Sequence, residues 1–577
     1  MKEKLETLLR DALTNLGIMA ETIVLEHPAE LSHGDYSTSV ALAYAKKIAN
    51  PPAGGPRALA EKIVAELSSE KLAELGIEKM DIAGAGFINF HLSKDFFAKE
   101  IETINTLGSK WGTNSASRGK KVMVEYTDPN PFKPFHIGHL MTNAIGESTA
   151  RIFEYSGANV VRANYQGDVG LHVAKAIWCL LKKGKGDTSL SVQAQAEYIG
   201  ACYVEGSTAY EENPDAKIEI DAINKKVYEK ADPAINDMYD WGRKVTLEAF
   251  ETIYALLGTK FQSNCYFFES VMAPIGKKIV QENTGTVFEE SDGAIVFKAE
   301  KYNPKLHTRV FINSQGLPTY ETKEIGLTVT KFEQENPDLS IVVTAIEQGP
   351  YMSVVQKAIS LIHPDYESRM KHLTHGMMRF ASGKMSSRKG NVITGESLLQ
   401  DARDLVHEKI KEREYEENER DSIAAQVSVA AIKYTILKQQ LGGNIIYDEE
   451  HSVSFEGDSG PYLQYTAVRA QSIHEKGKNA GLVSSAVLPA EWKTTSLEKY
   501  LYRFPEVVER SYQFLEPHHI AGYLLELAAQ FNSFYGQEKI VDSTDATSPY
   551  KLALTEAFRT TMKNGLYLLG IEIPNKM

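Results

Sequence analysis

The sequence predicts an α/β domain with a parallel sheet, preceded by an α+β module and followed by an α-helical bundle. A strand–loop–helix–strand pattern that begins at residue 121 is typical of a βαβ unit. The continuous apolar run at 340–346 suits a buried parallel strand. From about residue 421 onward almost every segment has helical periodicity. The chain has 577 residues, more than one core usually organises, so several domains are expected.

The first module, 1–112, begins with an amphipathic helix that carries Leu5, Leu8, Leu9 and Leu13 on one face. A helix is expected near 59–67 and a short strand at 86–90, and the segment 50–58 is a turn-rich connection. We expect the α/β domain over 113–454 and the helical bundle over 455–577.

Within the α/β domain we expect a strand at 121–126, a helix at 145–155 that ends near Gly157, and a strand at 159–163. The polar and acidic segment 184–240 is predicted to be an insertion, and the charge run 408–422 a solvated helix face. Later helices are expected at 423–441, 462–473, 505–515, 519–534 and 552–569.

Composition limits the class of protein. Apolar residues make up 43% and charged residues 24%, as in ordinary globular proteins. No apolar run approaches the roughly 20 residues that span a bilayer, and the first residues are not those of a signal peptide. The spacing of Cys179, Cys202 and Cys265 predicts neither disulfides nor a zinc site, which favours a cytoplasmic location. A net charge of -13 argues against global attraction to nucleic acid but allows a local basic groove.

The stretch PNPFKPFHIGHL, 129–140, follows the first expected strand and places His136 and His139 three residues apart. On a helical turn they share a face, where imidazoles can donate to phosphate oxygens. Gly138 would let a purine lie against bare backbone, and the helix adds its N-terminal dipole. Taken alone, residues 136–139 fit ordinary surface histidines or half of a metal site as well as they fit a nucleotide site.

A second stretch, GKMSSRKG at 383–390, is a glycine-bounded loop with three cations and two hydroxyls. Such a loop can close over a polyanion and neutralise the charge that develops as pyrophosphate leaves. Alone it fits a solvated basic turn, but the pairing with the histidine box upstream favours a nucleotide site.

This pair resembles the HIGH and KMSKS boxes of class I aminoacyl-tRNA synthetases, and further stretches resemble arginyl-tRNA synthetases in particular. These are EYTDPNPFKPFHIGHL, RANYQGDVGLH, TYETKEIG, GDSGPYLQY and EPHHIAGYLLELAAQFNSFY, with GDYSTSVALAYAKK and AGAGFINFHLS in the first module. The resemblance implies a Rossmann-type catalytic domain, an appended N-terminal domain that contacts tRNA and an anticodon-binding helical bundle.

The resemblance also implies an activity, ligation of L-arginine to tRNA(Arg) through an arginyl-adenylate. ATP is the implied second substrate, with Mg²⁺ on its phosphates, and no metal bound by the protein itself. The class I resemblance further implies transfer to a terminal 2′-OH, activation that waits for tRNA, no membrane, and a monomer.

Residue roles follow from the same resemblance, and an arginine pocket also needs carboxylates or amides placed for a planar guanidinium. Glu125, Asp128, Asn130, Glu324 and Gln348 are expected at strand ends, where ligands of parallel sheets bind. The expected arginine-binding set is Glu125, Asp128, Asn130, His136, Tyr320, Glu324 and Gln348. The expected ATP-binding set is His136, Gly138, His139, Met378, Lys384, Met385 and Ser386. The expected catalytic set is Lys133, His136, His139, Lys384, Arg388 and Lys389.

Three positions depart from the family pattern. Ser387 stands where many class I enzymes have a second lysine, and Lys133, just upstream of HIGH, is expected to take over that role. Glu324 replaces the usual aspartate with a longer acid, and Asp128 replaces a small residue. That extra acid could aid the guanidinium or repel the substrate carboxylate.

In the turn GDVG, 167–170, which is expected to follow a strand that ends at Asn164, the glycines fit a purely structural role. The resemblance places Asp168 and His172 near the substrates. In the bundle, aromatic residues could stack on unpaired bases, although helical spacing more often means core. The candidates are Tyr462, Tyr465, Phe531, Phe534 and Tyr535, of which we expect Tyr465 and Phe534 to be buried.

Rival functions remain at this point. A nucleotidylyltransferase also uses HxGH-type boxes, but it would need neither the bundle nor the first module. A cysteinyl or methionyl enzyme would more often carry zinc cysteines and a hydrophobic pocket. A catalytically inactive RNA-binding relative is the third alternative, and the intact His136, His139, Lys133 and Lys384 argue against it.

Overall fold

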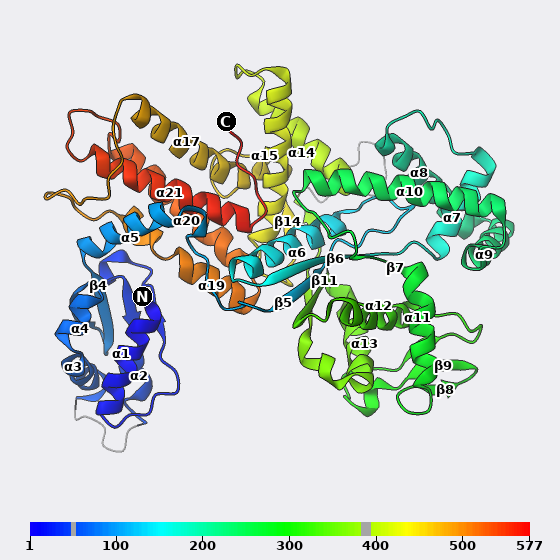
Figure 1. Ribbon diagram of the computed structural model, residues 1–577, viewed down its shortest axis with the longest axis horizontal. Helices are drawn as coiled ribbons and strands as arrows, with labels where there is room; N and C mark the ends of the chain where they lie inside the picture. Colours follow the sequence, from blue (N-terminus) through cyan, green and yellow to red (C-terminus); the bar gives the residue numbers. More distant parts are fainter. Residues whose placement is uncertain (48–53, 382–393) are drawn as a thin grey trace. The chain divides into compact units, whose positions relative to one another are not determined.

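The computed structural model describes residues 1–47, 54–381 and 394–577. The chain divides into two compact units (Figure 1). Unit 1 comprises 1–112, 466–509 and 523–565, and unit 2 comprises 113–465, 510–522 and 566–577.

Unit 1 begins with an antiparallel sheet whose strands lie in the order β1-β2-β4-β3, packed with helices. Leu5, Leu9 and Leu13 of the first helix are fully buried and Leu8 is partly buried, which confirms the predicted amphipathic face. The elements are α1 (Lys2–Asn15), β1 (Leu25–Glu26), β2 (Tyr36–Thr38), α2 (Val40–Tyr44), α3 (Gly55–Glu66), α4 (Ser69–Glu74), β3 (Ile77–Ala83), β4 (Phe87–Leu92) and α5 (Lys94–Leu107).

The last third of the chain is helical, as predicted. Phe534 is buried, but Tyr465 is only half-buried, so the prediction for Tyr465 was wrong. Five helices of the described chain follow residue 459. They are α17 (Gly460–Asn479), α18 (Ser496–Leu501), α19 (Phe504–Phe514), α20 (His518–Gln537) and α21 (Ser548–Leu568).

Unit 2 is built on a five-stranded sheet in the order β12-β11-β5-β6-β7, in which every neighbouring pair is parallel. From β5 the chain runs outward through β6 to β7, and then returns to the other side of β5 as β11. The order therefore reverses between β5 and β11, and ligands of open α/β sheets bind beside such a point. The strands are β5 (Lys121–Glu125), β6 (Asn159–Gln166), β7 (Tyr266–Phe268), β11 (Leu339–Ala345) and β12 (Met370–His375).

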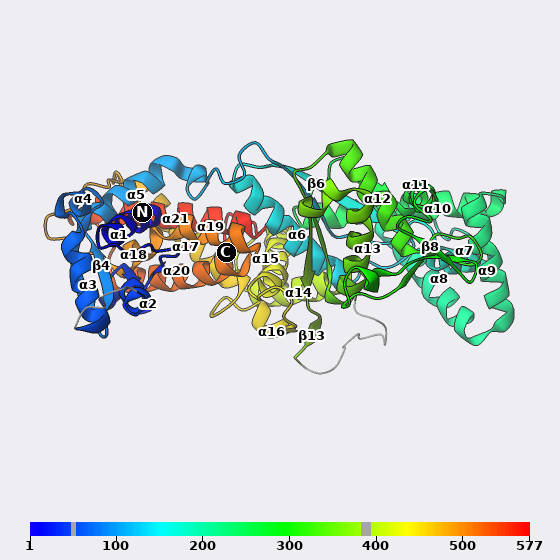
Figure 2. The ribbon, with the colours of Figure 1, turned by 90° about the horizontal axis from the view of Figure 1, so that it is seen from below.

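Helices cover both faces of this sheet (Figure 2). The helix α6 (Ile137–Tyr155) lies on one face, and α11 (Glu269–Glu282) and α12 (Tyr320–Glu335) pack on the other around Met123, Met272 and Leu327. Strand β6 extends to Gln166 rather than ending at Asn164, because its last three residues pair with β7. The predicted turn therefore starts directly at Gly167.

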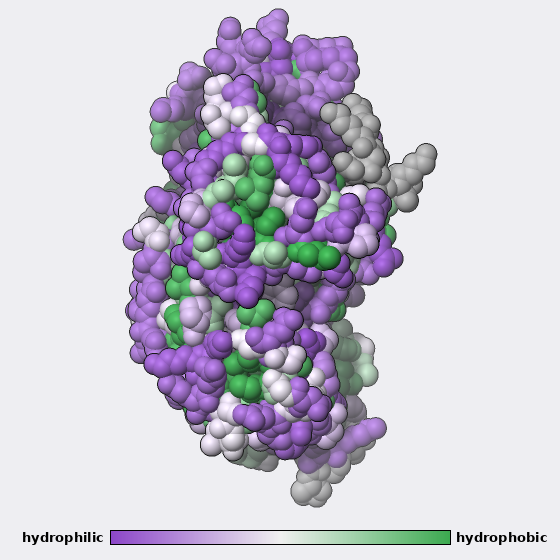
Figure 3. Space-filling view, turned by 90° about the vertical axis from the view of Figure 1, so that its right-hand side faces the viewer, coloured by the Kyte–Doolittle hydropathy of each residue, from purple (hydrophilic) through white to green (hydrophobic). Residues whose placement is uncertain are grey.

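The predicted insertion is a group of helices that packs with α7 around its own core. Its outer face is mostly hydrophilic with small separate hydrophobic groups (Figure 3). The elements are α7 (Leu171–Lys183), α8 (Val192–Glu212), α9 (Pro214–Glu229) and α10 (Pro233–Leu256).

The charge run 408–422 is not one helix face, so that prediction was wrong. The helix α14 (Gly395–Ile410) ends inside it and α15 (Glu417–Leu437) begins inside it. Arg420 donates to the carbonyls of Arg413 and Tyr415, which closes the turn between the two helices.

Smaller elements complete unit 2, and in the described part of the chain no helix is long and apolar enough to cross a membrane. Strands β8, β9 and β10 form an antiparallel sheet and β13 pairs with β14. Their bounds are β8 (Glu289–Ser291), β9 (Ala294–Phe297), β10 (Arg309–Ile312), α13 (Gly349–Ile362), β13 (Met378–Phe380), β14 (Ile445–Tyr447) and α16 (Glu449–Ser452).

Candidate active site at the carboxyl ends of the parallel strands

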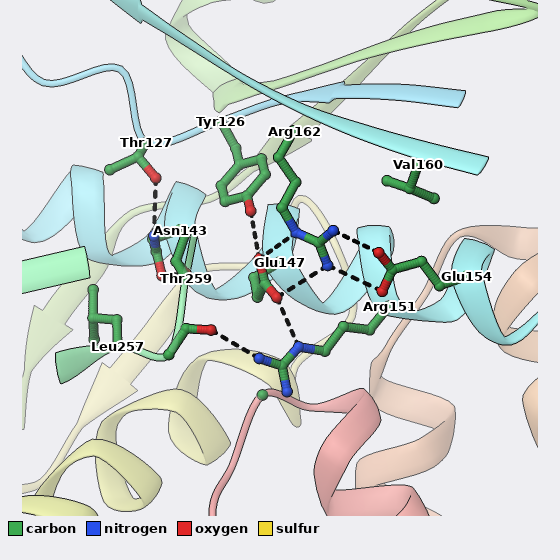
Figure 4. Close-up of polar contacts among 12 residues, drawn as sticks. Tyr126, Thr127, Asn143, Glu147, Arg151, Glu154, Val160, Arg162, Leu257 and Thr259 are labelled. Atoms are coloured by element: carbon green, nitrogen blue, oxygen red, sulfur yellow. Dashed lines mark hydrogen bonds and ion pairs between the residues drawn. The ribbon is translucent and has the colours of Figure 1, made fainter. Parts of the chain in front are cut away.

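The loop between β5 and α6 holds an unusual backbone conformation. Thr127, Asp128 and Phe132 all have positive φ, at 79°, 47° and 68°. A β-branched or bulky residue rarely adopts this region, and such strain persists where the surroundings enforce it. The Thr127 hydroxyl accepts a hydrogen bond from the Asn143 amide at 3.0 Å (Figure 4), and Phe132 is fully buried. The loop is therefore locked in one shape over the end of β5.

The two predicted histidines lie together at the start of α6. Their rings stack with centroids 3.5 Å apart, and the backbone N–H of His136 donates to Nδ1 of His139 at 3.2 Å. Because that nitrogen accepts, the proton of neutral His139 is on Nε2, which leaves an N–H donor.

Both imidazoles are neutral near pH 7. Burial, and then the charge of Lys133, lowers the pKa of His136 to about 4. Burial also lowers the pKa of His139 well below its ordinary value. Neutral N–H donors at a helix N-terminus suit phosphate oxygens, and their pKa values keep them from becoming cations at neutral pH.

Lys133 and Gly138 flank the histidines. The Lys133 ammonium lies 5.4 Å from the centre of the Tyr203 ring, which is on insertion helix α8. A Cβ on Gly138 would come 3.0 Å from the His136 ring, so a larger residue would push that ring aside. Glycine at this position thus keeps the stacked pair in place as well as leaving backbone open.

Acidic side chains gather on the other side of the loop. Glu125 is almost fully buried and accepts a 2.6 Å salt bridge from Lys331, which is equally buried. Asp128 accepts a hydrogen bond from the backbone N–H of Tyr165 at 2.7 Å, which joins the loop to β6. Burial, followed by the charge of Glu125, raises the pKa of Asp128 well above its ordinary value.

Glu324 belongs to the same group, but it lies on helix α12 and not at a strand end, so that part of the prediction was wrong. Burial, and next the charge of Glu125, raises the pKa of Glu324 to about 8. The Tyr351 hydroxyl donates a hydrogen bond to Glu324. A carboxylate with this pKa is only partly ionised at neutral pH.

The remaining expected arginine contacts lie on the loop after β5, after β11 and at the start of α12. The Asn130 amide oxygen lies against Gly167, where a Cβ would approach it to 2.1 Å. Gln348 follows β11 at a strand end, as predicted, and is exposed. Tyr320, at the start of α12, is 63% exposed and its ring lies 4.9 Å from the Lys323 ammonium. These exposed groups are therefore free to contact a ligand.

The side chains of Asp168 and His172 form hydrogen bonds with other parts of the protein. The Asp168 carboxylate accepts from Arg243, from the Tyr239 hydroxyl and from both donors of Ser270, at 2.8 to 3.0 Å. His172 Nε2 donates to the Gly167 carbonyl at 2.8 Å, and burial lowers its pKa to about 3. Asp168 joins α10 and α11 to the turn, so a direct substrate role for it is not supported.

Met378 lies on β13, just before the segment 382–393. The predicted loop residues Lys384, Met385, Ser386, Arg388 and Lys389, together with Ser387, lie outside the described residues.

Comparisons with known proteins agree with this geometry. The model for "tRNA synthetases class I (R), catalytic domain" matches residues 101–448. The chain belongs to the class I arginyl-tRNA synthetase family. Models for the "DALR anticodon binding domain" and the "Arginyl tRNA synthetase N terminal domain" match 463–577 and 3–92.

Relatives of the whole chain support the same membership. The arginine–tRNA ligase of Clostridium perfringens is 31% identical over 89% of this chain and 90% of its own. That of Clostridium acetobutylicum is 30% identical over 98% of both. The arginyl-tRNA synthetase structure from Thermus thermophilus has the same fold, with a TM-score of 0.79 at 23% identity and full coverage of both chains.

Sequence reasoning missed several groups in the pocket. Lys331 neutralises Glu125, and Lys323 forms a buried 2.7 Å salt bridge with Glu269. Among the described residues no partner reaches the buried Tyr165 hydroxyl. Lys331 follows Glu324 by seven residues on α12. This spacing places both side chains on one helix face, so it could have revealed Lys331 as a member of the site.

The donor set around the histidines also bears on the Mg²⁺ expected in this family. Neutral imidazoles and a lysine bind phosphate oxygens but offer no oxygen ligands, which Mg²⁺ requires. Among the described residues, the one group of His and acidic side chains arranged to hold a metal is Glu516, His518 and His519, and it includes no predicted site residue. Lys133, His136 and His139 therefore fit Mg²⁺ only as an ion carried by the ATP phosphates.

Proposed function

We propose that this chain ligates L-arginine to tRNA(Arg), with ATP converted to AMP and pyrophosphate. One observation carries the substrate assignment: the buried acidic cluster has surplus carboxylate. Glu125 and Glu269 each have a lysine partner, whereas Asp128 and Glu324 form no ion pair with any described residue. Two such acids beside Asn130 suit a planar cation with five donors, and they would repel an apolar or acidic substrate.

In the first step the arginine carboxylate attacks the α-phosphorus of ATP and pyrophosphate leaves. Asn130 and His136 hold the α-amino and α-carboxylate end, while the acids hold the guanidinium. His139 Nε2–H and Lys133 donate to the phosphate oxygens as charge develops, which lowers the barrier by electrostatic stabilisation. Lys384, Arg388 and Lys389, with the ATP contacts of Gly138, Met378, Met385 and Ser386, are proposed from the family pattern alone.

In the second step the 2′-OH of the terminal ribose of tRNA attacks the carbonyl of the adenylate. The neutral state of the imidazoles allows one of them to accept that proton, although positioning dominates both steps. When bound, Mg²⁺ would neutralise phosphate charge.

The organisation of the chain is proposed to follow these roles. A tRNA-contacting domain occupies 1–112, the catalytic domain 113–454 with its insertion near 184–240, and the anticodon-binding domain 455–577. The family models support this order with matches at 3–92, 101–448 and 463–577. We propose that the protein is a cytoplasmic monomer. Its three free, buried cysteines support the reducing compartment.

Pyrophosphate exchange with each amino acid, with and without total tRNA, tests the function. Exchange with arginine alone, and only when tRNA is present, is the expected result. Robust exchange with another amino acid, or none under any condition, would overturn the proposal. A cytidylyltransferase would instead release pyrophosphate from CTP without any amino acid, and an inactive RNA-binding relative would bind tRNA without exchange.

A further inference from the structure

The last segment of unit 2 is held by side chains from the histidine-bearing helix. We call residues 566–572, the last three residues of α21 and the four that follow, the C-terminal strap. Ser148 on α6 donates to the Leu568 carbonyl at 2.8 Å, and Arg151 on α6 donates to the Tyr567 carbonyl at 2.9 Å. The Arg151 guanidinium also lies 4.7 Å from the centre of the Tyr567 ring. Two consecutive carbonyls of the strap thus bind one face of α6.

A second helix, α15, also holds the strap. Lys433 is buried, and its ammonium donates to the Gly570 carbonyl at 2.8 Å and to the Leu257 carbonyl at 2.6 Å. Gly570 has a φ of 66°, and a Cβ there would lie 2.8 Å from the Lys433 nitrogen. Gln464 secures the end of the strap by donating to the Glu572 carbonyl at 2.6 Å. Buried carbonyls satisfied by specific side chains make a segment costly to displace.

The same arginine connects the strap to the sheet. Arg151 donates through Nε to Glu147 at 2.7 Å, and Glu147 also accepts from Arg162 of β6 at 2.9 Å and from the Tyr126 hydroxyl (Figure 4). Arg162 in turn donates to both oxygens of Glu154. Helix α6 is therefore fixed between the sheet and the strap by charged hydrogen bonds, which are stronger than neutral ones.

These bonds act on the site through the helix itself. Ser148 and Arg151 lie about three to four turns from His136, and a hydrogen-bonded helix moves as a rod over that length. A shift at the strap therefore moves the stacked histidines more than the arginine-binding acids, because Asp128 is tied to β6 through the Tyr165 N–H and Glu324 lies on α12. We propose that the C-terminal strap is a positioning element for the phosphate-binding histidines, with Ser148 and Arg151 as its positioning residues. This inference rests on the proposed function.

The test compares Arg151→Lys and Ser148→Ala with a matched control, Arg369→Lys. Arg369 also donates to a backbone carbonyl, that of Pro337 at 3.0 Å, and lies 4.8 Å from a ring centre, that of Phe332, but it precedes β12 at the opposite edge of the sheet. We expect kcat per active site, counted by burst titration, to fall about tenfold in the first two variants, because displacements near 1 Å cost one to two decades. The KM for arginine should change less than twofold, and Arg369→Lys should leave both unchanged.

A structural readout separates this inference from the function. Hydrogen–deuterium exchange of the amides at 139–142 should rise in Arg151→Lys relative to wild type, whether or not arginine is the substrate. Unchanged kcat per site in Ser148→Ala, or an equal loss in Arg369→Lys, would overturn the positioning role. If Arg151→Lys does not fold, Ser148→Ala removes a single hydrogen bond and decides the question. A wild-type protein that exchanges no pyrophosphate with arginine would instead refute the proposed function.

Discussion

Arginine binding is expected to weaken as the pH falls below about 8. Burial and the charge of Glu125 raise the pKa of Glu324 to about 8, so the empty pocket carries a proton at neutral pH. The groups that face this carboxyl are Glu125 on β5, Asp128 on the loop after β5, Lys331 on its own helix, Glu269 on α11 and Tyr351 on α13. A guanidinium binds the ionised form, so arginine must displace the proton.

The size of the effect follows from that pKa. For a titration of Glu324 alone with a pKa of about 8, the apparent KM for arginine is multiplied by 1 + 10 raised to the power (8 − pH). It should therefore rise about tenfold between pH 9 and pH 7, and about 100-fold between pH 9 and pH 6, or about 1.4 kcal/mol per pH unit at the acid end.

Initial rates of arginylation, with ATP and tRNA saturating, give this KM from pH 6 to pH 9. The histidines do not interfere, because the pKa values of His136 and His172 are about 4 and about 3. Lys433, whose pKa burial lowers to about 7, titrates in the window, but it holds the strap and would alter kcat rather than arginine affinity. In Glu324→Gln the KM should be high and flat. A flat profile in the wild type would refute the reasoning.

The same shift predicts the stability of Glu324→Gln. The folded state holds this proton up to about pH 8, whereas an unfolded glutamate loses it near 4.5, so the wild type loses stability as the pH rises through that window. The amide variant should therefore gain about 1–4 kcal/mol of unfolding free energy at pH 8.5 and almost none at pH 4.5. Urea unfolding at both values measures this, and an equal change at both would contradict it.

Three further substitutions test separate contacts. Lys133→Ala should lower the activation rate about 100–1000-fold with little change in the KM for arginine; a silent Lys133→Ala beside an inactive Lys384→Ala would contradict its role. Gly167→Ala should raise the KM for arginine about tenfold or more in steady-state kinetics, because the added Cβ would lie 2.1 Å from the Asn130 amide oxygen and displace it. An unchanged KM would exclude Asn130 from arginine binding. Lys331→Met should cost about 3–5 kcal/mol in denaturant unfolding because Glu125 is left as a buried charge without a partner, and a loss under 1 kcal/mol would show that Glu125 simply takes up a proton.

The sequence predicted most of the fold because its signals are local. Apolar runs identify β5 and β11, and the spacing of His136 and His139 identifies the start of α6 without any tertiary information. The pocket depends instead on pairs far apart in the chain. Lys331 meets Glu125 across 206 residues, and no periodicity predicts such a pair.

Errors in the candidate site have the same cause. Glu324 was expected at a strand end because ligands of parallel sheets bind there, yet it lies on the second turn of helix α12. Asp168 was expected near the substrates because of the family resemblance. Its four hydrogen bonds come from two helices, α10 and α11, whose position only the tertiary fold determines.

Asp128 and Glu324, the two acids that depart from the family pattern, can be explained together. With Glu125 and Glu269 paired to lysines, Asp128 and Glu324 leave two negative charges for the single positive charge of a guanidinium. Two bare carboxylates in a buried site repel each other, and Glu324 does raise the pKa of Asp128. A proton that stays on Asp128 makes the arginine complex neutral, and a second proton, on Glu324, is the one that arginine displaces. A neutral isostere of arginine would have no charge with which to displace that proton, so the same two carboxylates that set the pH dependence also select for a cation.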